Sequence, residues 1–159
     1  MADVTLRPAR IDDIEGLVVL LHETFRSTWQ PMLTRIAIER YWRNDVARRY
    51  VIEEWPRFIV AEVGGCVAGM IDCDDDFISA LHVMDRMRRR GIGRSLLEQV
   101  EAVAVATGAE CLRLETDSFN TAAQALYASR GFREIDRYPD EEWQSGLTTV
   151  LMEKTLPIG

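Results

Sequence analysis

Seven short stretches of the chain carry the apolar pattern of β-strands. Their residues alternate between apolar and polar, or are apolar throughout, and they stop at glycine, proline or aspartate. The predicted strands cover residues 4–7, 58–63, 67–73, 77–84, 111–116, 132–138 and 148–156. Gly64 and Gly65 form a two-residue hairpin signal between the second and third strands, so these two should pair.

Between the strands, apolar residues at helical spacing predict four helices. These cover residues 12–25, 34–46, 93–106 and 120–129, and the last two stop at Gly108 and Gly131. Helices that separate strands, with hairpins in the middle of the chain, predict a mixed α/β sheet. Because no linker or internal repeat divides the chain, we expect one domain over residues 1–159.

Composition narrows the class of protein. Apolar residues make up 47% of the 159 residues, enough for one core, and no apolar run approaches the ~20 residues that span a bilayer. The net charge of −7 argues against a general nucleic-acid binder. The three cysteines lack metal-ligand spacing and the first residues lack the apolar stretch of a signal peptide. We therefore expect a cytoplasmic chain with no metal site and no membrane contact.

The clearest chemical signal is the run Arg88-Arg89-Arg90-Gly91-Ile92-Gly93, between a predicted strand and a predicted helix. Glycines at a helix start let a ligand approach the backbone, and the free N–H groups there attract anions. Arg86 and Arg94 add positive charge. A dinucleotide-binding loop would need a third glycine where Leu96 stands, and a P-loop would need a lysine where the chain has none. The run predicts a different phosphate site or a solvated basic turn.

The residues after this turn give it a context. Asn120 is followed seven residues later by Tyr127, and then by Gly131 and Phe132. With Ala123, Ala125 and Leu126, these residues resemble the second signature of the GNAT acetyltransferase superfamily, while the glycine turn resembles its pyrophosphate loop. The resemblance covers about residues 58–156, and Asp85 departs from it because many relatives have proline there. It implies a mostly antiparallel sheet of six or seven strands, with helices on both faces and a splayed central strand pair.

In this family acetyl-CoA binds between the splayed strands, here residues 77–84 and 111–116. The resemblance implies that the backbone N–H groups of Leu81 and Val83 face the acetyl carbonyl and the pantetheine arm. His82 lies between them in the same cofactor-binding stretch, and its side chain should point to the other face as a packing histidine rather than a base. The residues of the pyrophosphate loop would be Arg88, Arg89, Arg90, Gly91, Ile92, Gly93, Arg94 and Ser95. Asn120 would contact the CoA arm and could also cap its helix.

The resemblance also implies catalytic roles. Tyr127 would stand near the thioester sulfur and protonate the departing thiolate, with simple packing on the sheet as the alternative. Glu115, five residues before Asn120, would accept the amine proton, with a solvent-facing carboxylate as the alternative. The other position that some relatives use for a base holds Phe77, and Ser79 on the same face could position a water.

The acceptor would bind against the first helices and the loop before the last strand. This places Phe25, Trp29 and Tyr138 in the acceptor wall, together with Thr28, Met32, Leu33 and residues 139–143. Aromatic rings with carboxylates suit an apolar or cationic amine, while ordinary packing is the alternative.

The expected function is therefore direct transfer of acetyl from acetyl-CoA to a primary amine of a small molecule or peptide. A non-catalytic acyl-CoA-binding regulator on the same fold is the alternative, because a fold does not fix a function. Residues 148–156 are expected to form an edge strand, which could pair two copies in a homodimer.

Overall fold

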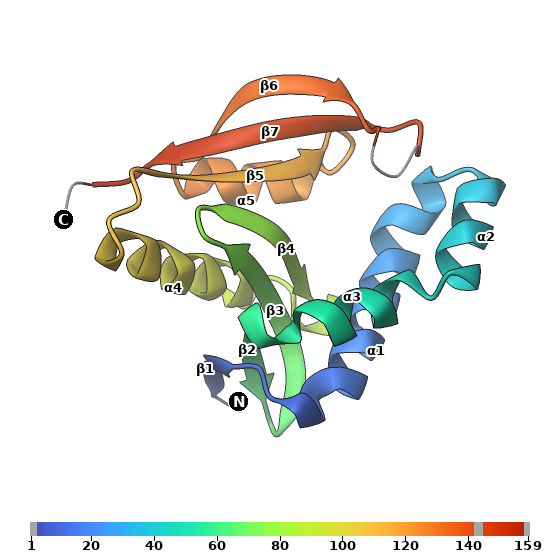
Figure 1. Cartoon of the computed structure of the whole chain (residues 1–159), viewed down its shortest axis with the longest axis horizontal. Helices are drawn as coiled ribbons and strands as arrows, with labels where there is room; N and C mark the ends of the chain where they lie inside the picture. The colour runs from blue at the N-terminus through green and yellow to red at the C-terminus, as the bar shows by residue number, and fades with distance from the viewer. Residues whose placement is uncertain (1–2, 142–144, 158–159) are drawn as a thin grey trace.

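The computed structural model describes residues 3–141 and 145–157, and within them seven strands form one sheet (Figure 1). The strands are β1 (Val4–Pro8), β2 (Phe58–Val63), β3 (Cys66–Asp74), β4 (Phe77–Val83), β5 (Cys111–Asp117), β6 (Arg133–Pro139) and β7 (Thr148–Thr155). They lie in the order β1-β2-β3-β4-β5-β7-β6, and each neighbouring pair is antiparallel except β4 and β5. The prediction of a mixed, mostly antiparallel sheet is confirmed.

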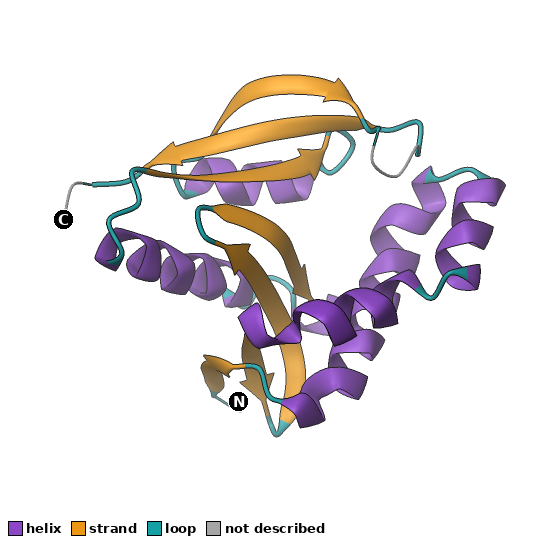
Figure 2. Ribbon diagram, in the orientation of Figure 1, coloured by secondary structure: helices purple, strands orange, loops and turns teal. Residues whose placement is uncertain are grey.

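Helices cover both faces of this sheet (Figure 2). They are α1 (Ile14–Thr24), α2 (Arg35–Arg43), α3 (Val46–Glu54), α4 (Ile92–Ala106) and α5 (Thr121–Ser129). Side chains alternate between the faces of a strand, so Val60 and Met70 join the core with α1 and α3, while Ala61 and Ile71 join the core with α4. No helix in the described ranges is long and apolar enough to span a bilayer.

The helix predicted over residues 34–46 corresponds to α2, and the separate helix α3 that follows it was not predicted. After α2 ends, Asp45 adopts a left-handed conformation with a φ of 49°, and α3 then begins. This turn directs Ala47 and Val51 into the core beside α1, where both are buried. The prediction ends at Val46, which continues the helical spacing of apolar residues from α2 across Asn44 and Asp45, and so it misses the rest of α3.

The strand β7 lies inside the sheet, so the prediction that residues 148–156 form an edge is wrong. It pairs with β5 on one side and with β6 on the other. A hairpin can join a sheet with either of its strands innermost, and the apolar pattern does not distinguish the two. In the described residues the edges are β1 and β6. Residues 148–156 are therefore not available as a sheet edge that could pair two copies in a homodimer.

The parallel pair β4 and β5 separates soon after it forms. In the described structure the pairing is limited to Phe77 with Arg113 and Ile78 with Leu114, although β4 continues to Val83. Ser79 is an extra β4 residue in the ladder with β3, and such a bulge bends its strand. Meanwhile β5 stays paired with β7 along its whole length. The predicted splayed pair is confirmed, and its opening positions the candidate site.

Candidate functional site

A cavity of about 130 Å³ lies between the separated strands. Seven of the residues that line it were candidates from the sequence: Trp29, Ser79, Leu81, His82, Glu115, Asn120 and Tyr127. They come from the π-helical turn Phe25–Trp29, from β4, from β5 and from α5 with its cap. The fold thus gathers side chains that are up to about a hundred positions apart in sequence.

The backbone of β4 is open toward this cavity. Met84 donates its N–H to the carbonyl of Ala68 on β3, at 2.8 Å. The backbone groups of a strand point alternately to its two sides, so those of His82 also point to β3. The groups of Leu81 and Val83 point the other way, into the gap that β5 leaves. This is the direction that the sequence interpretation requires of these two N–H groups.

The glycine turn leads directly into α4. Gly91 precedes the helix with a φ of 78°, and a Cβ at this residue would meet no atom within 4 Å. Ser95 makes the first helical hydrogen bond, from its N–H to the carbonyl of Gly91, so the N–H groups of Ile92, Gly93 and Arg94 have no helical acceptor. Such N–H groups and the helix dipole form an anion site.

Gly93 has a further reason to lack a side chain. A Cβ there would lie 3.2 Å from Leu126 Cδ2, so the absence of a side chain also lets α4 pack closely on α5. The side chain of Ile92 is buried in the core, which leaves only its backbone for a ligand.

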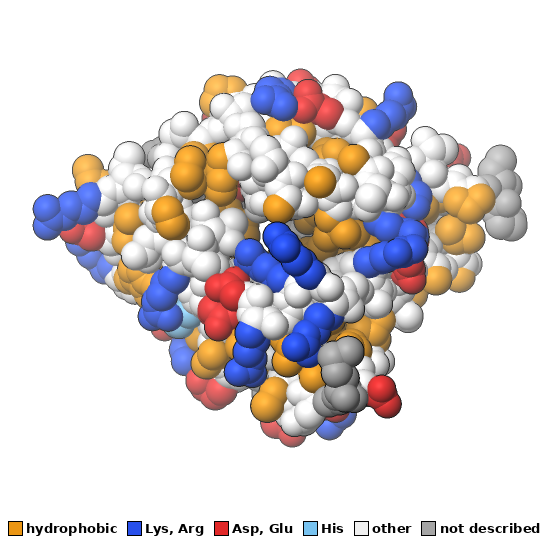
Figure 3. All heavy atoms as spheres, turned by 180° about the vertical axis from the view of Figure 1, so that it is seen from behind, with side chains coloured by type: hydrophobic (Ala, Val, Ile, Leu, Met, Phe, Trp, Pro, Cys, Tyr) orange, Lys and Arg blue, Asp and Glu red, His pale blue; other side chains and the backbone are white. Residues whose placement is uncertain are grey.

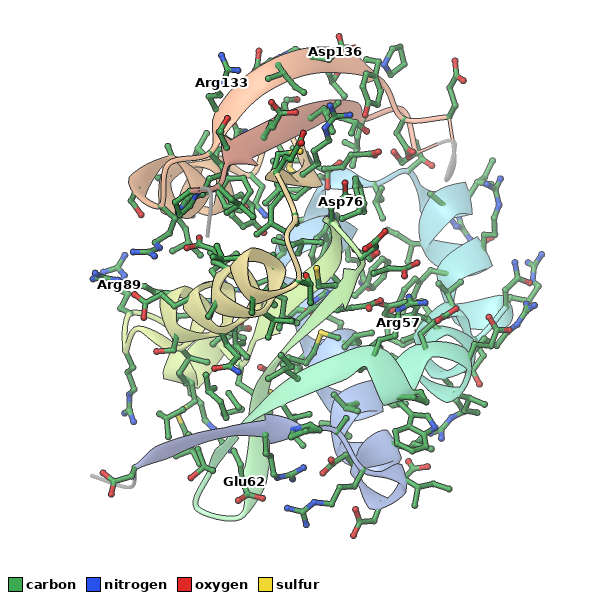
Figure 4. The ribbon with its side chains drawn as sticks, turned by 60° about the vertical axis from the view of Figure 1, so that its left-hand side comes forward. Arg57, Glu62, Asp76, Arg89, Arg133 and Asp136 are labelled. Carbon is green, nitrogen blue, oxygen red and sulfur yellow. The ribbon has the colours of Figure 1, made fainter. Side chains whose placement is uncertain are left out.

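The arginines of the turn differ in their surroundings. Arg88 lies 3.0 Å from Asp85 and donates to the Thr28 hydroxyl, and Arg94 pairs with Glu98. Arg89 and Arg90 are exposed, and Arg89 projects outward from the turn (Figure 4). On the face seen from behind, basic side chains gather around a hollow near its centre (Figure 3). The turn is therefore a positive region in a chain of net negative charge.

The helix α5 presents Asn120 and Tyr127 to the cavity. The Asn120 side chain caps the helix by accepting the N–H of Ala123, as its capping interpretation expects. Tyr127 is buried, which raises the pKa of its phenol to about 12. In the described part of the chain its hydroxyl has no hydrogen-bond partner. The hydroxyl oxygen is not fully buried, because part of its surface is open, and Tyr127 lines the cavity. The hydroxyl is therefore reachable from the cavity and protonated at neutral pH.

Trp29 and Asp117 close one side of the cavity. The indole N–H of Trp29 donates to Asp117 Oδ2 at 2.7 Å. This bond connects the π-helical turn to the end of β5. Burial raises the pKa of the Asp117 carboxyl, and the charge of Asp140 adds to this rise. Asp117 is absent from the sequence candidates, although its place two residues after Glu115 put it on the same face of the strand.

His82 lines the cavity as well as packing. Its Nδ1 lies 2.7 Å from the hydroxyl of Thr24 on α1, and its ring centroid lies 5.6 Å from that of Trp29. Burial, helped by the charge of Arg88, lowers the pKa of the imidazole to about 4. The ring does lie on the face opposite Leu81 and Val83, but this face is open to the cavity because β5 has separated from β4.

A second hollow, of about 290 Å³, lies outside the cavity. It is lined by Glu115, Tyr138, Pro139, Asp140, Glu141 and Thr149, so Glu115 borders both spaces. Burial and the nearby carboxylate of Glu115 raise the pKa of the Tyr138 phenol. We call this space the outer hollow; of the predicted wall segment after Tyr138, residues 142 and 143 lie outside the described ranges.

Phe25 lines neither space. It is 7% exposed, and its ring stacks on that of Tyr41 with centroids 3.5 Å apart. Its place in the acceptor wall stays a prediction. No group of three or more potential metal ligands occurs among the described residues.

Comparison with known proteins identifies the family of this chain. The profile of the Acetyltransferase (GNAT) family matches residues 15–132, most of the chain. The chain belongs to this family. It is 36% identical over 106 residues to an IAA acetyltransferase of Azospirillum brasilense, a match that covers 63% of this chain and 68% of that protein. It is 33% identical over 111 residues to N-alpha-acetyltransferase 30 of Xenopus laevis, covering 64% of this chain but only 40% of the relative.

Solved GNAT structures share the fold. The PaiA N-acetyltransferase of Thermoplasma acidophilum, in complex with coenzyme A, superimposes with a TM-score of 0.80 at 21% identity. The match covers 96% of this chain and 99% of that one. The resemblance drawn from the glycine turn and the Asn120–Tyr127 spacing is confirmed at the level of family and fold.

Burial of His82 should make the stability of this GNAT chain depend on pH. The pKa of His82 is lowered from 6.5 to about 4 in the folded chain, so between these values only the unfolded chain binds this proton. The free energy of unfolding should therefore fall as the pH drops below 6.5. The variant His82→Asn should lack this part of the dependence, at most about 1.4 kcal/mol per pH unit. Urea unfolding at several pH values in this window measures it, and equal slopes for both proteins would contradict a buried neutral ring.

Proposed function

We propose that this chain transfers acetyl from acetyl-CoA to an amine of a small molecule or peptide, by direct attack of the amine on the thioester. The cavity between β4 and β5 carries the proposal. The strand β4 leads from it into the basic glycine turn, and Glu115 joins it to the acidic outer hollow. An anionic donor and a cationic acceptor can therefore approach from different sides. The names of two relatives, an IAA acetyltransferase and N-alpha-acetyltransferase 30, support acetyl transfer.

The chain offers a suitable group for each part of acetyl-CoA. The pyrophosphate would lie on the free N–H groups of Ile92, Gly93 and Arg94, in the open space beside Gly91. Arg89 and Arg90 would add charge there. The pantetheine arm would follow the open backbone of β4, and an N–H of Leu81 or Val83 would stabilise negative charge on the carbonyl oxygen. The PaiA N-acetyltransferase, which has the same fold and is in complex with coenzyme A, supports binding of this donor by the chain.

Tyr127 is the proposed general acid. Its phenol is protonated at neutral pH, and its hydroxyl is reachable from the cavity. Attack of the amine breaks the carbon–sulfur bond, and the sulfur leaves more easily when a donor stabilises its charge and supplies a proton. A reachable hydroxyl with no partner among the described residues suits this task, whereas packing alone would not require it.

Glu115 is the proposed acceptor of the amine proton. An amine must be neutral to attack, and a lysine-like amine is mostly protonated at neutral pH. Glu115 is exposed and borders both spaces, so it can take this proton at the entrance and pass it to solvent. The carboxylates of Asp140 and Glu141 give the outer hollow a charge that favours a cationic acceptor.

Replacement of Gly91 tests the acetyl-CoA site. Gly91→Ala should weaken acetyl-CoA binding at least about tenfold, because the new Cβ would occupy the space in which the phosphates meet the backbone. Gly108→Ala is the matched control, since Gly108 follows the other end of α4 with a φ of 84° and equal free space. Calorimetry compares the dissociation constants. Equal weakening in both variants would attribute the effect to backbone strain and refute the site.

Replacement of Tyr127 tests the acid. Tyr127→Phe keeps the ring and removes the proton donor, so kcat should fall by about 10²-fold while acetyl-CoA affinity is retained. Tyr50→Phe is the control for loss of a buried tyrosine hydroxyl, because Tyr50 bonds Asp72 outside the cavity. Release of CoA thiol with a panel of amines gives the rate. A wild-type chain that binds acetyl-CoA but turns over no amine would favour the regulator instead.

Replacement of Glu115 tests the proton acceptor. Glu115→Gln should lower kcat/KM for the amine and shift the rising part of its pH profile upward, because an amide does not take up a proton at neutral pH. Glu134→Gln, on the exposed edge strand β6, is the control with the same change of charge. A higher KM with an unchanged profile would show that Glu115 only binds a cation. If neither changes, a water held by the backbone and Ser79 takes the proton.

A further inference from the structure

A short series of hydrogen bonds connects His82 to α1. The hydroxyl oxygen of Thr24 lies 3.2 Å from the carbonyl of Leu21 and 2.7 Å from His82 Nδ1. A threonine hydroxyl has one proton and can also accept one, so the tautomer of His82 sets the direction of the Thr24–Nδ1 bond. When the Thr24 proton goes to the Leu21 carbonyl, Nδ1 donates to Thr24, and the second ring nitrogen, Nε2, carries a free lone pair.

The Nε2 atom lies at the end of this series of hydrogen bonds and has no partner in the described protein. Among the described residues, no group makes a hydrogen bond to Nε2. This atom is also absent from the fully buried polar atoms that lack a partner, so part of its surface is open. It therefore remains reachable, and the space beside the ring is the cavity between β4 and β5. The ring is partly buried, and its other polar atom, Nδ1, is bonded to Thr24. The Nε2 atom is therefore placed to accept a hydrogen bond from a ligand.

Burial keeps the ring neutral, and a nearby charge adds to its effect. Burial and then the charge of Arg88, in the turn after β4, lower the pKa of the imidazole to about 4. From β5, Asp117 reaches the same side of the cavity but is engaged by Trp29, and Glu115 lies toward the outer hollow. Tyr127 of α5 is protonated. Above pH 6 the imidazole is therefore an uncharged acceptor, too weak a base to remove a proton from an ammonium ion.

We propose that His82 binds the acceptor amine through Nε2, which accepts an amine N–H and so directs the nitrogen lone pair toward the thioester. Thr24 is a positioning residue, because it holds the ring in the tautomer that can accept. The inference rests on the proposed acetyl transfer and makes the acceptor a primary amine that loses its extra proton before it enters the cavity, so that one N–H is held by His82 and the other can leave. The bonds balance: C–N forms and C–S breaks, one N–H proton leaves through Glu115 to solvent, and the sulfur takes the Tyr127 proton, which solvent replaces.

Three variants separate this role from packing. His82→Asn places an amide near the position of Nδ1, where it can still donate to Thr24, but has no atom in place of Nε2. Thr24→Val keeps the side-chain shape and removes the hydroxyl, so Nδ1–H loses its acceptor. Thr24→Ser retains the hydroxyl and is the rescue variant. Each is measured in the full chain for acetyl-CoA affinity, for kcat/KM with the best amine of the panel, and for folding by its melting curve.

We expect His82→Asn and Thr24→Val to lower kcat/KM for the amine at least about tenfold, with acetyl-CoA affinity unchanged. Because the ring stays neutral, the factor for His82→Asn should be the same at every pH above 6, unlike the shifted profile of Glu115→Gln. Thr24→Ser should recover most of the rate. Packing loss alone would lower the melting temperature without this rescue pattern.

Nitrogen NMR reports the tautomer directly. The chain contains two histidines, so ¹⁵N-histidine labelling gives two imidazoles, and His22→Gln identifies the signals of His82. The wild type should show a protonated Nδ1 and an unprotonated Nε2, and Thr24→Val should shift the proton to Nε2 or mix the two forms.

The outcomes distinguish this proposal from the proposed function. Wild-type kcat/KM in both His82→Asn and Thr24→Val, or a protonated Nε2 in the wild type, would overturn the role of His82 while acetyl transfer stands. A wild-type chain with no turnover on any amine would overturn both.

Discussion

The separation of β4 from β5 is the constraint on which the rest of the site depends. A strand inside a sheet must satisfy backbone groups on both sides, and β5 does so with β7 along its length but with β4 at two residues only. The bulge at Ser79 starts the separation, and beyond it the open groups of Leu81 and Val83 have space for a ligand instead of a strand. A regular ladder here would close the cavity and leave Tyr127 as an ordinary core residue.

The same opening creates an electrostatic asymmetry. The basic turn before α4 continues from the end of β4, whereas the carboxylates of Glu115, Asp140 and Glu141 border the outer hollow. The net charge of −7 does not reveal this asymmetry, because it sums the charges of the whole chain. What matters for the proposed reaction is the local field: an anion is stabilised at the helix N-terminus and a cation at the outer hollow.

Local patterns predicted the strands, most of the helices, the glycine turn and the Asn120–Tyr127 pair, because each depends on residues close in sequence. Three features depend on long-range packing and could not be read in this way. The position of β7 between β5 and β6 is set by which strand of a hairpin lies inside. The helix α3 is held by the burial of Ala47 and Val51 in the core with α1. The openness of His82 to the cavity follows from the strand separation, which alternation along β4 alone does not reveal.

The pairing of Trp29 with Asp117 shows how one irregular segment connects these parts. A π-helical turn shifts side chains relative to an α-helix, and such turns are often found at functional sites. Around it, Thr24 bonds His82, Ser27 bonds Asp85, Thr28 bonds Arg88 and Trp29 bonds Asp117. One turn of chain therefore contacts β4, the basic turn and β5. Arg88, on the proposed donor side, therefore lies in direct contact with Thr28, on the proposed acceptor side.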